Sequence, residues 1–337
     1  MNADRRSILM GSLAVVLAPL AAAHAQTLPP HVKDGDLPPG LPQPDETIDL
    51  WPNGLPGGES PGITETVIER SKDRLVTDRA VYGITRPRMA VFRPRKPNGA
   101  AVMITPGGGY KWVVVDKEGY EVGRRLSAQG YTVFVLFYRL PHEGWKDGAN
   151  TPLVDAQRAM RLIRARAQDY GIDPERVAAM GFSAGGHLCA DLGTRYDSKV
   201  YDPMDAADEL SARPFLAAPI YPVISMSAPN AHPGSREKLV GADADAAFEA
   251  AHSPHMNVPV GAPPFFILHA EDDDVVPAEN AVLLRAALKA KGTLVETHLF
   301  AHGGHGFGLR KAVGKPVEGW LDLFLNFAQA VRFANRY

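Results

Sequence analysis

The sequence has a single cysteine and no excess of charge of either sign. Because Cys189 is the only cysteine among 337 residues, an intramolecular disulfide is excluded. Cys189 also lacks the partner pattern of a metal site or of cysteine catalysis, so we expect a small buried residue. Lysine and arginine number 36 and aspartate and glutamate 38, a net charge of −2 at pH 7. This balance gives no support to nucleic acid as a partner.

Several familiar sequence signatures are missing as well. The chain has no P-loop, no dinucleotide-binding fingerprint and no internal repeat. No segment after residue 25 is apolar for long enough to cross a membrane. These absences exclude the common classes of nucleotide-binding protein and repeat protein. The length of 337 residues suffices for one large domain with a large hydrophobic core.

The N-terminus has the pattern of an export signal. Arg5 and Arg6 precede an apolar run over residues 8–23, and Ala23-His24-Ala25 offers small residues for cleavage after position 25. The paired arginines predict the twin-arginine route, with the ordinary secretory route as the alternative. We therefore expect a signal peptide over residues 1–25 and a periplasmic or secreted protein without stable membrane insertion. An uncleaved membrane anchor is the competing interpretation.

Residues 26–62 are crowded with proline and glycine, and no regular element of any length is expected at that density. Within this segment, Ile48-Asp49-Leu50-Trp51-Pro52 has enough apolar surface to dock on the rest of the protein. We predict an N-terminal extension that wraps the fold, followed by one folded domain over residues 63–337.

Strands and helices alternate through residues 63–337. The run 132–138 is continuously apolar, as a strand buried on both faces should be, and apolar residues recur at helical steps through 153–170. Strands are expected at 64–70, 88–93, 101–105, 132–138, 177–180, 215–220, 265–269 and 295–300, and helices at 118–129, 153–170, 186–192, 278–291 and 317–333. The first two strands are expected to lead the sheet as antiparallel members. This alternation predicts the α/β class, with a mostly parallel sheet covered on both faces.

A serine stands between two glycines in Gly181-Phe182-Ser183-Ala184-Gly185, where a predicted strand meets a predicted helix. Such a junction is too sharp for bulky flanking side chains, and it lifts the central serine toward solvent. This is the pattern of a nucleophile elbow, so Ser183 is the candidate nucleophile. Because the motif also occurs by chance, its weight comes from this context and from the motifs described next.

A glycine run, Pro106-Gly107-Gly108-Gly109-Tyr110, follows the strand predicted at 101–105. When a serine attacks a carbonyl carbon, negative charge forms on the oxygen, and fixed backbone N–H groups must point at it. We assign these donors to Gly108, Gly109 and Ala184, with Tyr110 as an alternative to either glycine. An ordinary flexible turn is the competing interpretation.

A carboxylate that could orient an imidazole follows the strand predicted at 265–269. Asp272, Asp273 and Asp274 compete for this role within one acidic run. The same run could instead cap the helix that begins near Pro277, and different aspartates could do each job.

The candidate base follows the last predicted strand, in Ala301-His302-Gly303-Gly304-His305-Gly306-Phe307. We prefer His305 to His302, because glycines border it on both sides and let the backbone bend toward the serine. His187 and His269 are expected to be packed, hydrogen-bonded structural residues.

Taken together, these motifs resemble the bacterial esterase/lipase group of α/β-hydrolases, and within it the acetyl xylan esterases and related carbohydrate acetylesterases. Further similar stretches are Trp51-Pro52-Asn53-Gly54, Tyr138-Arg139-Leu140-Pro141, Tyr221-Pro222-Val223-Ile224-Ser225-Met226 and Gly234-Ser235-Arg236. The proline before the glycine run departs from the His-Gly-Gly-Gly of hormone-sensitive-lipase-like enzymes, which favours the acetylesterase side. In hydrolases of this kind the acid commonly stands three residues before the valine of a Val-Pro pair, which selects Asp273.

The resemblance implies an α/β-hydrolase catalytic domain over residues 63–337 and acyl transfer in two steps. His305 takes the proton of Ser183, which attacks the ester carbonyl, and water then hydrolyses the acyl-serine; no metal or organic cofactor is needed. The expected substrate is a short-chain acetyl ester of a carbohydrate such as acetylated xylan, with a non-carbohydrate ester as the alternative. A serine peptidase of this fold would share the triad, but it usually carries a propeller, for which this chain has no room, or a glutamate-bearing loop for the substrate amine. A non-catalytic binding protein would normally lose one triad residue, and none is missing here.

The segment over residues 221–260 is longer than a plain connection and is expected to lie over the active site as a lid or substrate wall. Tyr110 and Arg236 are the candidate substrate contacts, with His232 as a further candidate.

Overall fold

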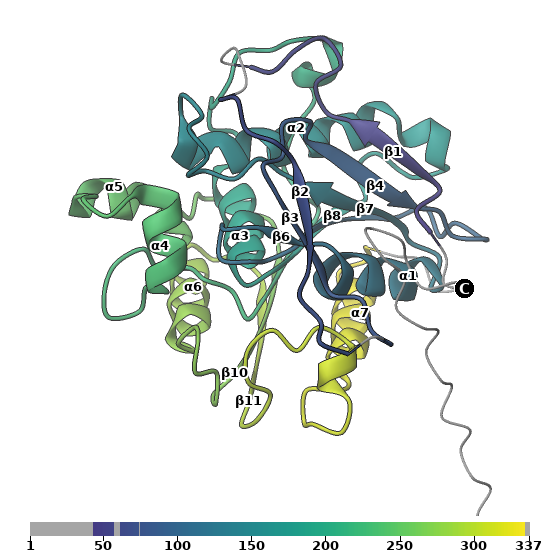
Figure 1. The fold of residues 1–337 in the computed structure, drawn as a ribbon. Helices are drawn as coiled ribbons and strands as arrows, with labels where there is room; N and C mark the ends of the chain where they lie inside the picture. The colour runs from purple at the N-terminus through teal and green to yellow at the C-terminus, as the bar shows by residue number, and fades with distance from the viewer. Residues whose placement is uncertain (1–42, 57–60, 74, 334–337) are drawn as a thin grey trace, which may run out of the picture.

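The computed structural model describes residues 43–56, 61–73 and 75–333, so the predicted signal peptide and residues 26–42 lie outside the described residues. Its centre is an eight-stranded sheet in the order β1-β4-β7-β5-β8-β9-β10-β11 (Figure 1). These strands are β1 Glu46–Asp49, β4 Arg88–Phe92, β5 Ala101–Thr105, β7 Thr132–Phe137, β8 Val177–Phe182, β9 Ala217–Ile220, β10 Phe265–Ala270 and β11 Val295–Phe300.

Neighbouring strands from β7 to β11 are parallel, whereas β1 and β4 run antiparallel at one edge. Strands β5, β7, β8 and β10 are buried at every position. Burial on both faces explains why their sequences are continuously apolar instead of alternating. The mostly parallel α/β sheet predicted from the sequence is confirmed.

Helices cover both faces of this sheet. The principal helices are α1 Glu121–Ser127, α2 Thr151–Ala165, α3 Ala184–Arg195, α6 Glu279–Ala290 and α7 Trp320–Ala330. The chain moves from β5 to β7 in one direction and from β7 past β5 to β8 in the other. Because parallel crossovers are right-handed, this reversal places α1 on one face and α2, α3 and α6 on the other. Figure 1 shows α7 on the same side as α1. The carboxyl ends of β5 and β8 therefore meet at a switch point, where sheets of this kind bind ligands.

A second, smaller sheet corrects one expectation. Strands β2 Thr66–Glu69, β3 Arg79–Tyr82 and β6 Val113–Val114 form a separate antiparallel sheet. The strand predicted at 64–70 thus exists, but it does not lead the main sheet, since it pairs with β3. Sequence reasoning missed β3 and β6, which are short and are held by this pairing.

The N-terminal extension contributes a strand to the main sheet. Strand β1 pairs with β4, with Glu46 opposite Val91, inside the segment predicted to lack regular structure and to precede the domain boundary at residue 63. Pairing with β4, not local propensity, stabilises this strand, so the sheet begins earlier than predicted. Leu50 and Trp51 are buried, as the docking expected for residues 48–52 requires.

The contact that fixes the extension is a buried polar cluster. The Trp51 Nε1–H donates to Asp155 Oδ1 at 2.9 Å, on α2. Asp155 is fully buried and also accepts from the backbone N–H of Arg139 at 2.9 Å and from its Nη2 at 2.7 Å. The Arg139 side chain is 3% exposed, so this pair compensates two charges that water does not reach.

Two further elements depart from the sequence expectation. The helix predicted at 118–129 starts as a π-helix over Asp116–Tyr120 and continues as α1. The segment 221–260 contains two helices, α4 Pro233–Val240 and α5 Ala246–Ala251, where only a lid or wall was expected. Within the three described ranges, no helix has the length and apolar character needed to cross a membrane.

Candidate active site

The junction of β8 and α3 holds Ser183 in a strained backbone conformation. Its φ is 54°, a positive value that residues other than glycine rarely adopt. A Cβ at Gly181 would collide with the carbonyl oxygen of Gly185, and a Cβ at Gly185 would collide with the carbonyls of Thr105 and Pro106. Only glycine fits at these two positions, and the serine side chain is therefore carried to the carboxyl edge of the sheet.

The structure brings Ser183, His305 and Asp273 into one hydrogen-bonded chain. His305 Nε2 lies 2.9 Å from Ser183 Oγ, and His305 Nδ1 lies 2.7 Å from Asp273 Oδ2. His305 comes from the loop after β11 and Asp273 from the loop after β10. This geometry allows the imidazole to take the serine proton while the carboxylate holds its other nitrogen protonated.

Of the three competing aspartates, only Asp273 meets the imidazole of His305 in the structure. Its other oxygen, Oδ1, accepts from the backbone N–H groups of Val275 at 3.0 Å and Val276 at 2.9 Å. Asp272 instead accepts from the N–H groups of Gly303 and Gly304, which braces the histidine loop.

The histidine predicted as the alternative base points elsewhere. The His302 side chain is 74% exposed and lies 3.4 Å from the Asp272 carboxylate. It does not reach the serine.

A second histidine holds the Asp273 carboxylate. His269 is fully buried at the end of β10, and its Nε2–H is shared between Asp273 Oδ2 and the carbonyl of Val276, both at 3.1 Å. Burial alone would raise the pKa of Asp273, but the hydrogen bonds from His269 and His305 outweigh it and hold that pKa well below its ordinary value. Asp273 is therefore ionised at neutral pH. The sequence placed His269 as a structural residue, and the structure shows which group it supports.

The glycine run after β5 forms part of the wall of the site. Three successive residues have positive φ, namely Gly108 at 130°, Gly109 at 65° and Tyr110 at 56°. Within the described ranges, the N–H groups of Gly108 and Gly109 donate to no protein acceptor. Ala184 starts α3, so its N–H is one of the donors that a helix leaves without an internal partner. The N–H of Tyr110 likewise donates to no protein acceptor within the described ranges, so these three N–H groups and that of Tyr110 are the candidate donors for an oxyanion beside Ser183.

Glu118 ties the loops of this site together, and sequence reasoning missed it. Its Oε2 accepts from the N–H of Gly107 at 3.0 Å, and its Oε1 accepts from the Tyr221 hydroxyl at 3.1 Å. The same hydroxyl accepts from the N–H of Gly308 at 3.3 Å. Glu118 is 3% exposed, so one buried carboxylate links the glycine run to the histidine loop through Tyr221. Nothing in the sequence around Glu118 distinguished it from its charged neighbours Asp116 and Lys117.

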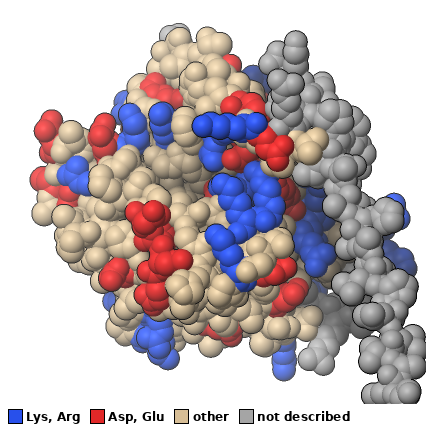
Figure 2. Space-filling model, turned by 60° about the horizontal axis from the view of Figure 1, so that its bottom comes forward, with Lys and Arg blue, Asp and Glu red and all other residues tan. Residues whose placement is uncertain are grey.

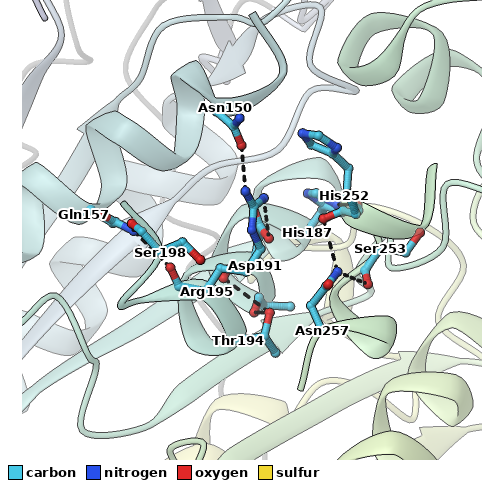
Figure 3. Close-up of polar contacts among 12 residues, drawn as sticks. Asn150, Gln157, His187, Asp191, Thr194, Arg195, Ser198, His252, Ser253 and Asn257 are labelled. Carbon is cyan, nitrogen blue, oxygen red and sulfur yellow. Dashed lines mark hydrogen bonds and ion pairs between the residues drawn. The ribbon is translucent and has the colours of Figure 1, made fainter. Parts of the chain in front are cut away.

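The Tyr110 side chain does not contact the site, which corrects the prediction that it binds substrate. It is fully buried, and its hydroxyl lies 2.7 Å from Nδ1 of His187 on α3. The other nitrogen of His187, Nε2, lies 2.7 Å from the carbonyl oxygen of His252 (Figure 3). Because a carbonyl only accepts, Nε2 carries the hydrogen, and Nδ1 accepts from Tyr110. Burial lowers the pKa of His187, which favours this neutral form. The packed role expected for His187 is confirmed.

A model of the BD-FAE family matches residues 89–288, more than half of the chain. The chain belongs to the BD-FAE family. The matched region contains Ser183 and Asp273 and ends before His305.

Two curated relatives of this BD-FAE chain are an acetylxylan esterase and a xylanase by name. The "Acetylxylan esterase" of Xylanibacter ruminicola is 33% identical over 228 residues, 66% of this chain and 44% of that protein. The "Endo-1,4-beta-xylanase B" of Butyrivibrio fibrisolvens is 29% identical over 86% of this chain and 46% of that protein. The chain thus spans less than half the length of these two relatives.

A solved structure extends the likeness to a whole protein. The acetyl ester-xyloside bifunctional hydrolase of Caldicellulosiruptor lactoaceticus is 33% identical, with a TM-score of 0.71 over 88% of this chain and 100% of that chain. A Thermogutta terrifontis esterase, with a TM-score of 0.62 at 24% identity, shares the fold. The BD-FAE domain of this chain is therefore a carboxylic ester hydrolase of the α/β-hydrolase fold, related to the acetylxylan esterases.

A pocket of about 440 Å³ opens over Ser183 and His305 in this BD-FAE domain. Gly108 and Gly109 form part of its wall. Helix α4 supplies Gly234 and Lys238 and its N-cap residue is His232, so the segment predicted as a lid or wall does border the site. The remaining lining residues are Arg70, Lys111, Trp112, Val114, Lys117, Glu118, Asp274, Val275 and Gly306.

Arg236 does not line this pocket, which corrects the second predicted substrate contact. Its Nε donates to Glu249 Oε1 at 2.7 Å, and its Nη1 donates to the carbonyl of Gly241 at 3.2 Å. The guanidinium therefore joins α4 to α5. His232, the other candidate from this segment, does line the pocket, and its Nδ1 accepts from the N–H of Ser235 at 3.1 Å at the start of α4. Among the described residues, no group of histidine, cysteine and acidic side chains is arranged to hold a metal ion.

Proposed function

We propose that the protein is a serine carboxylic ester hydrolase that releases short acyl groups, acetyl above all, from carbohydrate esters. The observation that carries the proposal is the hydrogen-bonded chain from Ser183 through His305 to Asp273 at the mouth of the pocket. The carbohydrate part of the proposal is supported by the names of the acetylxylan esterase relative and of the acetyl ester-xyloside hydrolase.

In this mechanism His305 Nε2 accepts the Ser183 proton as Oγ attacks the ester carbonyl carbon. The oxyanion receives hydrogen bonds from the N–H groups of Ala184, Gly108 and Gly109. The C–O bond to the sugar breaks, and the leaving alkoxide takes the proton from His305. Water then attacks the acyl-serine with the same imidazole as base, releasing the carboxylic acid and restoring Ser183.

Acetate release from acetylated xylo-oligosaccharides, with Ser183→Ala as the matched control, tests the proposal. We expect release by the wild type and none above background by the variant. Hydrolysis of p-nitrophenyl acetate without release from the oligosaccharide would keep the serine esterase and reject the carbohydrate. Equal activity of both proteins would overturn the role of Ser183.

A general short-chain carboxylesterase is the second candidate. The "Esterase LipC" of Mycobacterium tuberculosis, 29% identical over 85% of this chain, favours it. If this candidate holds, kcat/KM for simple alkyl acetates will equal or exceed that for acetylated xylosides. The same pair of substrates therefore decides between the two candidates.

We also propose that the protein is exported to the periplasm or secreted, on the pattern of Arg5, Arg6 and the apolar run that follows. Fractionation of expressing cells and N-terminal sequencing test this. Replacement of both arginines by lysine should retain the protein in the cytoplasm, and export of that variant would reject the twin-arginine route.

A further inference from the structure

The charge of the pocket is opposite to the charge of the chain. Four cationic side chains line the pocket beside Ser183, namely Arg70, Lys111, Lys117 and Lys238, although the whole chain has a net charge of −2. Figure 2 shows lysine and arginine side chains gathered in the middle of one face, with carboxylates on either side. The positive charge at the pocket is thus a local feature.

The carboxylates that line the pocket offset only part of this positive charge. Glu118 is 3% exposed and is engaged by the N–H of Gly107 and the hydroxyl of Tyr221, with Lys117 Nζ at 3.7 Å. Asp274, the other lining carboxylate, is exposed and forms no ion pair among the described residues. Two acidic groups therefore face four basic ones.

Two of the cations have no close carboxylate partner. Lys238 Nζ lies 4.0 Å from the carboxylate of Glu237, its neighbour in sequence, and Lys111 forms no ion pair among the described residues. Arg70, in contrast, is bound to Asp78 at 3.1 Å. Lys111 and Lys238 are the ammonium groups that remain available to an anionic ligand.

The same positive charges lower the pKa values of two nearby basic groups. Burial lowers the pKa of His142, and the charges of Lys238 and Lys111 lower it further. The charge of Lys117 is likewise the largest cause of a lowered pKa at Lys311. The charges of Lys111 and Lys238, which both line the pocket, thus act on a common neighbour.

An aromatic surface lies beside these charges. Trp112 lines the pocket, with Lys111 Nζ at 4.5 Å and the Arg70 guanidinium carbon at 5.8 Å from its ring centre. An indole offers an apolar face to the C–H groups of a sugar ring, while a neighbouring ammonium group can bind a carboxylate. The pocket therefore combines the contacts that an acidic sugar needs.

We propose that this pocket is selective for esters of acidic carbohydrates, with a uronate carboxylate bound by Lys111 and Lys238 while the ester carbonyl lies at Ser183. The inference rests on the proposed esterase function and names its substrate class. A neutral sugar ester would gain nothing from these two ammonium groups, whereas a uronate would gain attraction during both encounter and binding.

The experiment compares acetylated methyl glucuronoside with acetylated methyl glucoside, which differ only in the carboxylate. Acetate release is measured for the wild type, Lys111→Gln, Lys238→Gln and the double variant, with Lys289→Gln on the exposed face of α6 as the matched control. Each lysine loss should lower kcat/KM for the glucuronoside by about two- to fivefold, the range of exposed ion pairs. The glucoside rate and the Lys289→Gln rates should stay unchanged.

Salt provides a second readout that does not depend on substitution. Raising the ionic strength should lower kcat/KM for the glucuronoside in the wild type and leave the glucoside unaffected. Equal kcat/KM for the two sugars in the wild type, or equal loss on both in the lysine variants, would overturn the inference and leave the esterase in place. No Ser183-dependent release from either sugar would reject the proposed function itself.

Discussion

Asp273→Asn tests the chain of hydrogen bonds at the site, because four donors converge on this one carboxylate. Oδ2 receives His305 Nδ1 at 2.7 Å and His269 Nε2 at 3.1 Å, and Oδ1 receives the N–H groups of Val275 and Val276. Asparagine has one oxygen. If that oxygen keeps the two backbone donors, its NH₂ group faces both histidines.

His269 tolerates this arrangement, because its Nε2–H still has the carbonyl of Val276 at 3.1 Å. His305 does not, since it must turn its unprotonated nitrogen toward the amide and carry its hydrogen on Nε2. In that tautomer it cannot accept the proton of Ser183. We expect kcat to fall about 10⁴-fold, which corresponds to about 5.4 kcal/mol of transition-state stabilisation.

The opposite orientation of the asparagine preserves the tautomer but leaves two backbone donors unpaired. That arrangement would lower the free energy of unfolding by about 1–3 kcal/mol for each donor. The assay is therefore p-nitrophenyl acetate hydrolysis together with urea unfolding, and Asp274→Asn is the control that removes a nearby charge without the histidine contact. An Asp273→Asn variant within tenfold of wild-type kcat and equally stable would refute the reasoning.

The lowered pKa of Asp273 adds a pH signature to this comparison. A carboxyl whose pKa is depressed by folding stabilises the protein above its unfolded pKa of about 3.9, and the contribution is lost as pH falls through the folded value. The difference in unfolding free energy between wild type and Asp273→Asn should therefore shrink below about pH 4. A difference independent of pH would mean that the charge of Asp273 contributes nothing to stability.

Three further predictions follow from the neighbouring contacts. Glu118→Gln should lower kcat about 10- to 100-fold with little change in KM or melting temperature, since the loops it links shift relative to the serine; unchanged kcat would remove Glu118 from the site. Asp155→Ala strands the buried Arg139 guanidinium and should cost about 3–5 kcal/mol in urea unfolding, and a loss under 1 kcal/mol would contradict the buried-pair argument. Burial lowers the pKa values of His187 and His252 in the folded protein. As the pH falls, these histidines are therefore protonated in the unfolded chain before they are protonated in the folded one. The free energy of unfolding should then decrease below about pH 6.5, by up to about 1.4 kcal/mol per pH unit for each histidine. Between pH 7 and 5 this loss should be smaller in His187→Gln than in the wild type, and an equal loss would exclude His187 as its source.

The parts of the site that could be predicted are those fixed by local geometry. Ser183 was identifiable because only small residues fit around a strand-to-helix turn, a constraint written in five consecutive letters. His305 could be preferred to His302 because glycines border it directly on both sides, and this local feature lets the backbone bend toward the serine. The residues alone did not show which of the three aspartates contacts the imidazole. Their side chains are chemically identical, and only the path of the backbone determines where each one points.

The parts that could not be predicted depend on partners far away in the chain. Tyr110 was proposed to contact substrate, yet its hydroxyl meets His187, 77 residues later. The guanidinium of Arg236 is likewise paired with the carboxylate of Glu249 and does not reach the pocket. Glu118 gave no signal because its partners, Gly107 and Tyr221, come from two other loops. The sequence shows the chemistry of a long polar side chain, but it does not show which group will be its hydrogen-bond or ion-pair partner.

Strand β1 has a consequence for association between copies of the protein. It covers one edge of the large sheet, where β4 would otherwise present a row of free backbone N–H and C=O groups. Such a row is a template onto which a strand of another molecule can add. β1 itself is only four residues long and begins and ends with carboxylates, Glu46 and Asp49, which discourages further pairing. The proline-rich segment thus contains a strand that protects the sheet from edge-to-edge aggregation, and a chain shortened beyond residue 49 would lose this protection.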